Sequence, residues 1–165
     1  ITHVIASHLH MDHCGELRVF DGTDVPVYVN KEELKNAFFQ AKTDDGSIIY
    51  RLEDFDHDLN WQFLTLEYEH HFEDIELINV PGHAPGDTAL LIHTDKHGSI
   101  LFASDNIHVM ENWTEGVPLG GLALRDRQAW KASMAKMKDI ARQYDAEVIS
   151  AHDREQIAEI QPGWH

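Results

Sequence analysis

The stretch Ser7-His8-Leu9-His10-Met11-Asp12-His13-Cys14-Gly15 decides how the rest of the chain is interpreted. Three histidines and one aspartate lie within six positions, directly after an apolar run. Neutral imidazole nitrogen and carboxylate oxygen are the usual protein ligands of zinc and similar divalent ions. A chance histidine cluster on a solvated loop is the alternative, but it explains none of the spacing.

The spacing within this stretch divides the four side chains between two ions. If Val4-Ile5-Ala6 ends a strand, alternation points His8 and His10 to one face, as the first two ligands of one metal. Asp12 and His13 then lie on the turn beyond, where they can reach a second metal. The stretch therefore predicts a dinuclear metal site.

Length, charge and cysteine content narrow the class of protein. The 165 residues fit one domain, residues 1–165, with a real core. A formal net charge of -16 argues against binding to nucleic acid or to an anionic membrane surface. No apolar run in the sequence is long enough to cross a bilayer. The lone Cys14 excludes an internal disulfide and is compatible with a reducing, cytoplasmic location; we expect it to be a small buried residue.

Hydrophobic patterning predicts a chain of mixed α/β type. Helices are expected from Lys31, capped by Asn30 and fading near residues 44–46, and after Asp126, where an apolar stripe predicts core packing. Residues 47–66 show no clean periodicity and either wall a substrate pocket or form a helical or irregular segment over the core, while 106–125 are expected to form a loop rich in Gly and Trp. The expected strands are 1–6, 25–29, 75–80, 88–93, 99–103 and 147–150.

Histidines away from strand ends are assigned to the surface. His57, His70 and His71 lie among acidic residues, and His93 and His97 flank a predicted turn. We expect these five to be exposed and not to bind metal.

The remaining candidate ligands share one local context, because each follows a predicted apolar strand. The opening motif itself follows the strand that ends at residue 6. The other three positions are His83 after Val80, Asp105 after Ala103 and His152 after Ile149. Ends of neighbouring strands converge in space, since strands in a sheet lie only about 5 Å apart. Four such positions, each carrying His or Asp, are hard to attribute to chance.

Taken together, these motifs resemble the metallo-β-lactamase superfamily in order and spacing, over essentially the whole chain. Within it, the sequence is most similar to the N-acyl homoserine lactonase group. The features that carry this likeness are Ser7 to His13, Pro81-Gly82-His83-Ala84-Pro85-Gly86 before an apolar strand, Glu111-Asn112-Trp113 followed by Val117-Pro118, and His152-Asp153.

The resemblance implies an αββα four-layer sandwich, a mixed α/β fold, with two metals between its sheets. Zinc is the expected metal, with manganese, iron or cobalt as alternatives. The implied ligands are His8, His10 and His83 for metal one; Asp12, His13 and His152 for metal two; and Asp105 as the bridge. Asp12 is also expected to be catalytic.

Three departures from the family pattern stand out. Asp87 replaces the second histidine of the Pro-Gly-His motif, a supporting residue. His108 stands three positions after Asp105, where lactonases of this type carry a tyrosine near the substrate carbonyl. We expect His108 to be a catalytic hydrogen-bond donor to that carbonyl, although a solvent-facing loop histidine is the alternative. The superfamily's N-terminal strands are also missing, so we expect the chain to be an N-terminally truncated fragment.

The predicted activity is metal-dependent hydrolysis of a small-molecule ester or lactone, as in quorum quenching, with a homodimer as one expected assembly. A glyoxalase II-like thioesterase or a phosphotriesterase is the alternative within the superfamily. The scarcity of basic residues in 40–72 and 106–125 disfavours a phosphate or a glutathione carboxylate. A non-catalytic metal-binding domain is the alternative outside the enzymes.

Overall fold

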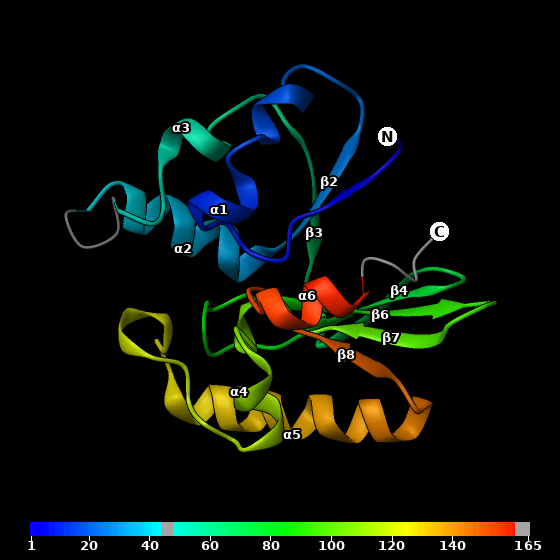
Figure 1. Ribbon diagram of the computed structural model, residues 1–165. Coiled ribbons are helices and arrows are strands. Elements are labelled where there is room, and N and C mark those ends of the chain that lie inside the picture. The colour runs from blue at the N-terminus through cyan, green and yellow to red at the C-terminus, as the bar shows by residue number, and fades with distance from the viewer. Residues whose placement is uncertain (44–47, 161–165) are drawn as a thin grey trace. The chain divides into compact units, whose positions relative to one another are not determined.

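The computed structural model describes residues 1–43 and 48–160. These residues divide into two compact units (Figure 1). The first unit contains residues 1–66 together with 84–86, and the second contains 67–83 and the chain from 87 onward. Each unit has its own sheet and its own hydrophobic core.

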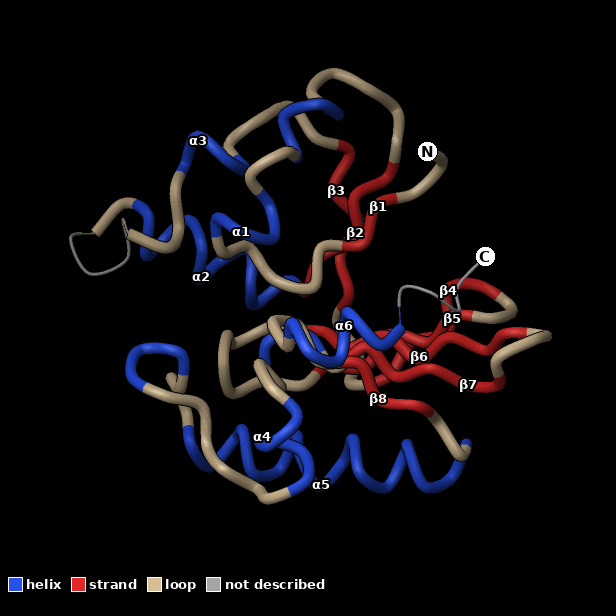
Figure 2. Tube along the Cα trace, in the orientation of Figure 1, coloured by secondary structure: helices blue, strands red, loops and turns tan. Residues whose placement is uncertain are grey.

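The first unit is built on a three-stranded parallel sheet with the order β1-β2-β3, drawn in red in Figure 2. Apolar side chains from the central strand and the helices, among them Val27, Val29 and Phe55, form its core. Its elements are β1 (Val4–Ile5), α1 (Met11–Cys14), a 3-10 turn (Leu17–Phe20), β2 (Pro26–Asn30), α2 (Lys31–Ala41), α3 (Leu52–Phe55) and β3 (Asn60–Leu64).

Helix α2 begins where the sequence predicts. The Asn30 side chain accepts a hydrogen bond from the Glu32 backbone N–H at 2.9 Å, which confirms the predicted N-cap. Two acidic residues in the first turn favour the positive end of the helix dipole. The helix ends at Ala41, and the predicted fading at residues 44–46 falls on 44–47, outside the described residues.

A buried carboxylate ties α2 to the loop that carries the opening motif. Glu33 is completely buried, and its oxygens accept hydrogen bonds from Leu9 N–H (3.1 Å), the Tyr50 hydroxyl (3.0 Å) and Gly86 N–H (3.2 Å). A Cβ at Gly86 would lie 2.6 Å from the Glu33 backbone nitrogen, so only glycine permits this approach. Glu33 therefore fixes the backbone between His8 and His10.

The second unit is built on a five-stranded mixed sheet with the order β4-β5-β6-β7-β8. Neighbouring strands are antiparallel except β7 and β8, which are parallel. Its elements are β4 (Tyr68–Phe72), β5 (Ile75–Asn79), β6 (Thr88–Thr94), β7 (Gly98–Phe102), a 3-10 turn (Ser104–Asn106), α4 (Met110–Thr114), a 3-10 turn (Gly121–Ala123), α5 (Arg127–Tyr144), β8 (Glu147–Ile149) and α6 (Arg154–Ile160).

Helix α5 packs its apolar stripe against this sheet (Figure 1). The Asp126 side chain caps the helix by accepting bonds from Gln128 and Ala129 N–H, both at 2.9 Å, as the sequence predicts. The stripe is buried as expected, except that Tyr144 at its end is only half-buried: Trp130, Met134, Met137, Ile140, Ala141 and Tyr144. The backbone at Gly82 approaches helix α5 closely, because a Cβ at this position would lie 2.6 Å from the Trp130 Cα.

Six of the described helices and strands are absent from the sequence expectations: β3, β4, α1, α3, α4 and α6. Strand β3 has a mostly half-exposed surface, and β4 is an edge strand that carries histidine and glutamate, so neither shows clean alternation. The four helices have only four to seven residues, too few for a helical period to stand out. Among the described helices, none is long and apolar enough to span a membrane.

Replacing Glu33 with alanine should destabilise the protein. The change removes the acceptor for three donors, and each buried donor left without a partner costs roughly 1–3 kcal/mol. We expect the free energy of unfolding, measured by chemical denaturation, to fall by about 3 kcal/mol or more. Glu32→Ala, which removes an exposed carboxylate from the same turn, is the control and should cost about 0.5 kcal/mol. Equal effects of the two changes would contradict this role for Glu33.

Candidate metal centre

The four side chains of the opening motif gather at one place in the first unit. The His8 ring centroid lies 4.5 Å from that of His10 and 4.1 Å from that of His13. The Asp12 carboxylate lies 3.6 Å from Nε2 of His13. His8 and His10 are buried, while Asp12 is exposed. The sequence analysis predicts this clustering from strand alternation, and that explanation is wrong: strand β1 ends at Ile5, so the loop and α1 bring the side chains together.

Backbone bonds hold this loop in shape. Met11 N–H, at the start of α1, donates to the Ile49 carbonyl at 2.9 Å, and the buried Cys14 thiol donates to the Leu9 carbonyl at 3.3 Å. The Tyr50 ring packs against the His10 ring at 4.6 Å, with its hydroxyl on Glu33. Imidazoles fixed in this way lose little conformational freedom when they bind an ion.

In the second unit, the other three predicted ligands meet around one carboxylate oxygen. Nε2 of His83 lies 3.3 Å from Oδ2 of Asp105, and Nε2 of His152 lies 3.2 Å from the same oxygen. These residues follow β5, β7 and β8, three strands of one sheet. Within this unit, the predicted convergence of strand ends is therefore confirmed.

The tautomer of His83 is set by its surroundings. Its Nδ1 lies 2.9 Å from the Ala123 carbonyl, which can only accept a hydrogen bond, so Nδ1 carries the proton. Nε2, which faces Asp105, is then left with a free electron pair, the form of imidazole that binds a metal ion. Imidazole and carboxylate donors at these separations fit a divalent ion such as zinc.

Asn106, next to Asp105, anchors the turn that carries this carboxylate. Its side-chain amide donates to Oδ2 of the buried Asp87 at 2.7 Å and also to the Val80 carbonyl. The backbone carbonyl of Asn106 accepts a hydrogen bond from the Trp130 indole N–H at 2.9 Å. Asp87 thus supports the site through Asn106. The sequence analysis missed Asn106, although its position beside Asp105 and after a strand was a signal.

The histidines assigned to the surface have different outcomes. His97 is exposed, as predicted. The prediction for His93 is wrong: it is half-buried, because its ring bonds the buried Glu76 carboxylate at 2.7 Å and the Ser99 hydroxyl at 2.9 Å. His57 is half-buried, with a ring nitrogen 3.0 Å from the Glu53 carbonyl. The side chains of His70 and His71 lie outside the described part of the chain.

Asp153, beside His152, serves as a helix cap. Its Oδ1 accepts bonds from Glu155 and Gln156 N–H at 3.0 and 3.1 Å, at the start of α6, and its Oδ2 accepts one from Met110 N–H at 2.9 Å. These bonds, led by that from Met110, hold the pKa of the Asp153 carboxyl below its usual value. Asp153 thereby ties the start of α6, beside His152, to the start of α4.

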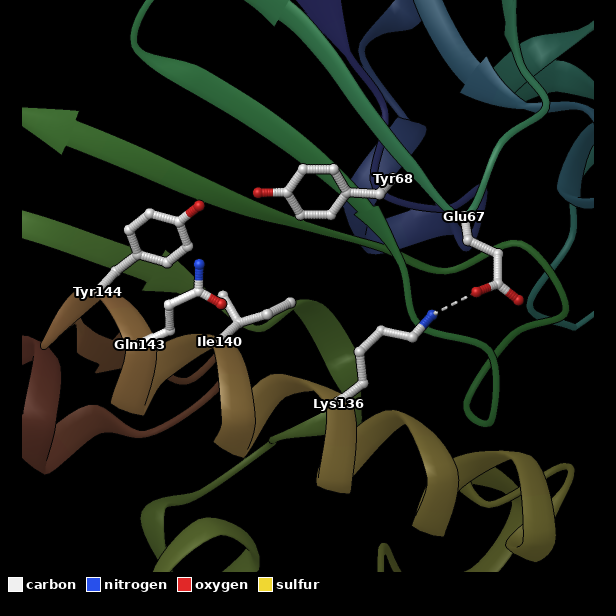
Figure 3. A pocket seen from close by; sticks show the side chains of 6 residues that line it. All are labelled: Glu67, Tyr68, Lys136, Ile140, Gln143 and Tyr144. Carbon is white, nitrogen blue, oxygen red and sulfur yellow. Dashed lines mark ion pairs between the residues drawn. The ribbon is translucent and has the colours of Figure 1, made fainter.

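A groove of about 440 Å³ in the second unit lies apart from this cluster (Figure 3). Helix α5 and the start of β4 form its walls, and Lys136 crosses it to reach the Glu67 carboxylate at 3.6 Å. Its lining contains no histidine and no predicted ligand: Glu67, Tyr68, Lys136, Ile140, Gln143 and Tyr144. The groove is therefore not part of the candidate metal centre.

The fold and the ligand motifs place the chain in a known class of metal-binding proteins. The metallo-beta-lactamase superfamily profile matches residues 1–152, and the chain belongs to this superfamily. The resemblance and the mixed α/β fold of metallo-β-lactamase type that the sequence predicts are thereby confirmed.

Within the superfamily, the chain is similar to N-acyl homoserine lactonases. It is 30% identical to the enzyme of Bacillus cereus over 156 residues, which cover 94% of this chain and 57% of the relative. It is 31% identical to AttM of Azorhizobium caulinodans over 159 residues, or 93% of this chain and 58% of the relative. The chain thus spans a little over half the length of these relatives.

Solved structures show the same likeness. A variant of Bacillus thuringiensis AiiA, with N-decanoyl-L-homoserine bound at its active site, superposes with a TM-score of 0.83 at 27% identity, covering 96% of this chain and 58% of that one. An N-acyl homoserine lactone hydrolase with N-hexanoyl-L-homoserine at its catalytic metal centre gives the same values.

Replacing Asn106 with alanine should destabilise the second unit. The buried Val80 carbonyl and Asp87 carboxylate each lose a donor, which we expect to lower the free energy of unfolding by about 2–4 kcal/mol. Gln128→Ala, which removes an exposed amide from α5, should change it by less than about 0.5 kcal/mol. Chemical denaturation of the two variants checks this, and an Asn106→Ala protein as stable as the control would refute it.

The Cys14 thiol should resist alkylation in the folded protein. Burial, followed by the nearby Asp54, Glu33 and Asp12 charges, raises its pKa to about 12, so at pH 8 it stays a neutral thiol. We expect iodoacetamide to react at least about 1000-fold more slowly than with the same protein in denaturant, where the pKa returns to about 8.5. Mass spectrometry of both samples measures the rates. Similar rates would show that the native thiol is accessible.

Proposed function

We propose that this chain carries the metal centre of a hydrolase that opens a lactone ring, of the N-acyl homoserine lactonase type. The main support is that every ligand position of the motif is filled, in a chain about 30% identical to N-acyl homoserine lactonases. The clustering of the opening motif, and of His83, Asp105 and His152, supports the same proposal.

We propose the ligand set that the resemblance implies, with Asp105 as the bridge between two ions. His8, His10 and His83 belong to one ion; Asp12, His13 and His152 belong to the other. Zinc suits this mixture of imidazole and carboxylate, while manganese, iron and cobalt are alternatives that the same donors accept.

The bound ions would supply a hydroxide nucleophile at neutral pH and polarise the ester carbonyl. The residues of the chain do the rest. His83 is held in the metal-binding tautomer by the Ala123 carbonyl, and Asp105 is held by the turn that Asn106 anchors. The exposed carboxylate of Asp12 would carry the remaining proton of the attacking hydroxide to the leaving alcohol oxygen, which gives a carboxylate and an alcohol; this is its proposed catalytic role.

The charge of the chain favours an uncharged substrate. The net charge is -16, and residues 106–125 contain two glutamates and a single Lys or Arg, Arg125. A glutathione thioester, with its two carboxylates, would be repelled by such a surface. The N-acyl-homoserine molecules bound in the two similar structures are products of lactone opening, which agrees with a lactone substrate.

Three substrates test the proposal directly. The purified full-length protein, stripped of metal and then reloaded with zinc, manganese or cobalt, is assayed on N-hexanoyl homoserine lactone, a glutathione thioester and a phosphotriester. We expect lactone hydrolysis that requires metal and levels off at two ions per chain. Preference for either other substrate would support the corresponding alternative hydrolase. Binding of metal without any hydrolysis would support a non-catalytic domain. The homodimer and the cytoplasmic location stay predictions.

Variants of three histidines separate ligands from surface residues. His83→Ala and His152→Ala each remove a proposed ligand and should lower kcat/KM on the lactone by at least about 100-fold, since metal stabilises the transition state by several kcal/mol. His97→Ala, which changes an exposed histidine, should stay within about twofold of the parent protein. Equal losses in all three would show that the division between ligand and surface histidines is wrong.

A further inference from the structure

The side chain of His108 lies beside the Asp105 carboxylate, with its Nε2 atom turned away from solvent. Its backbone is fixed on both sides, because its N–H donates to the Asn112 side chain at 3.0 Å and its carbonyl accepts from His152 N–H at 3.0 Å. Although 29% of the side chain is exposed, the Nε2 atom is buried and makes no hydrogen bond to the described residues. A buried ring nitrogen of this kind needs a partner.

His108 belongs to the same cluster as two proposed ligands. Its ring centroid lies 5.4 Å from that of His83 and 5.1 Å from that of His152, in both cases edge to face. Its Nε2 lies 3.3 Å from Oδ2 of Asp105. One buried carboxylate oxygen is therefore surrounded by three imidazole nitrogens at 3.2–3.3 Å, of which only two belong to the ligand set above.

These separations match those between the ligand atoms of one ion. Zinc–nitrogen and zinc–oxygen bonds of about 2.0–2.2 Å, arranged tetrahedrally, place neighbouring donors about 3.3–3.5 Å apart. His108 meets this spacing to Asp105 as closely as His83 does. Moreover, the ligand atoms of His83, Asp105 and His108 all lie within 4.8 Å of one another, close enough to share a single ion.

We propose that His108 is a metal ligand, forming with His83 and Asp105 a three-donor site in the second unit. This inference rests on the proposed metal centre, but it assigns His108 a role other than the carbonyl donor that the sequence predicts. The two roles differ in one measurable respect. A ligand contributes to metal affinity, whereas a hydrogen-bond donor to substrate leaves the affinity of the substrate-free protein unchanged.

Metal competition tests the inference. Zinc affinity of the full-length protein and its variants is measured against a chromophoric chelator, and the number of bound ions by elemental analysis. We expect His108→Ala to lower the affinity for one of the two ions by more than 100-fold. This exceeds the 10–100-fold loss of affinity that removal of a residue hydrogen-bonded to a ligand causes. His108→Cys, which supplies a thiolate ligand, should recover at least part of this affinity. His97→Ala is the matched control and should bind both ions as the parent does.

The His108→Tyr variant separates the two roles further. A tyrosine can donate a hydrogen bond to a carbonyl but is a poor neutral ligand, so we expect it to weaken zinc binding as His108→Ala does. With cobalt in place of zinc, both variants should also show an altered visible absorption spectrum. If His108→Ala and His108→Tyr bind two ions with the affinity and cobalt spectrum of the parent, His108 is not a ligand, and the proposed function stands. If the parent protein itself binds no metal, the proposed function fails as well.

Discussion

The second unit is organised around one buried negative charge. Asp105 is 3% exposed, and removing a carboxylate from water is costly unless positive charge or hydrogen-bond donors compensate it. This charge is compensated by the imidazoles of His83, His108 and His152, each of which follows a different strand or turn. A divalent ion compensates such a charge more fully than neutral imidazoles do, because it brings charge of opposite sign into the same place. Sheet order, strand length and turn structure in this unit all serve to bring those groups together.

Glu33 in the first unit shows the contrasting use of a buried carboxylate. Its oxygens are satisfied by two backbone N–H groups and a tyrosine hydroxyl, which are permanent parts of the fold. Asp105 instead faces three imidazole nitrogens, which are donors of the proposed metal sites. One carboxylate therefore stabilises the loop between His8 and His10, while the other is the proposed bridging ligand. The difference arises from their neighbours, since both side chains are almost fully buried.

The sequence predicts the convergence of the strand-end residues well, because they combine unusual residue types with a repeated local context. His83, Asp105 and His152 meet in the second unit for that reason. It predicts the supporting residues poorly. Asn106 and Glu33 act through individual hydrogen bonds to groups 17–53 positions away, and no local pattern marks such a partner. The error at His93 has the same origin, because its burial depends on Glu76 from a neighbouring strand, 17 positions away. Likewise, β4 is hidden by the polar side chains that an edge strand tolerates.

The position of His108 links the metal centre to substrate choice. Ligand residues alone do not distinguish a lactone from a thioester or a phosphotriester, because the same donors serve all three chemistries. Discrimination must come from side chains that reach the reacting carbonyl without belonging to the shared ligand set. His108 follows Asp105 by three residues, just beyond the 3-10 turn, and its Nε2 lies 3.3 Å from the Asp105 carboxylate. A tyrosine there reaches further and stays neutral, whereas an imidazole is shorter and competes for metal. In the proposed assignment, a single substitution at this position therefore exchanges a hydrogen-bond donor for a metal ligand.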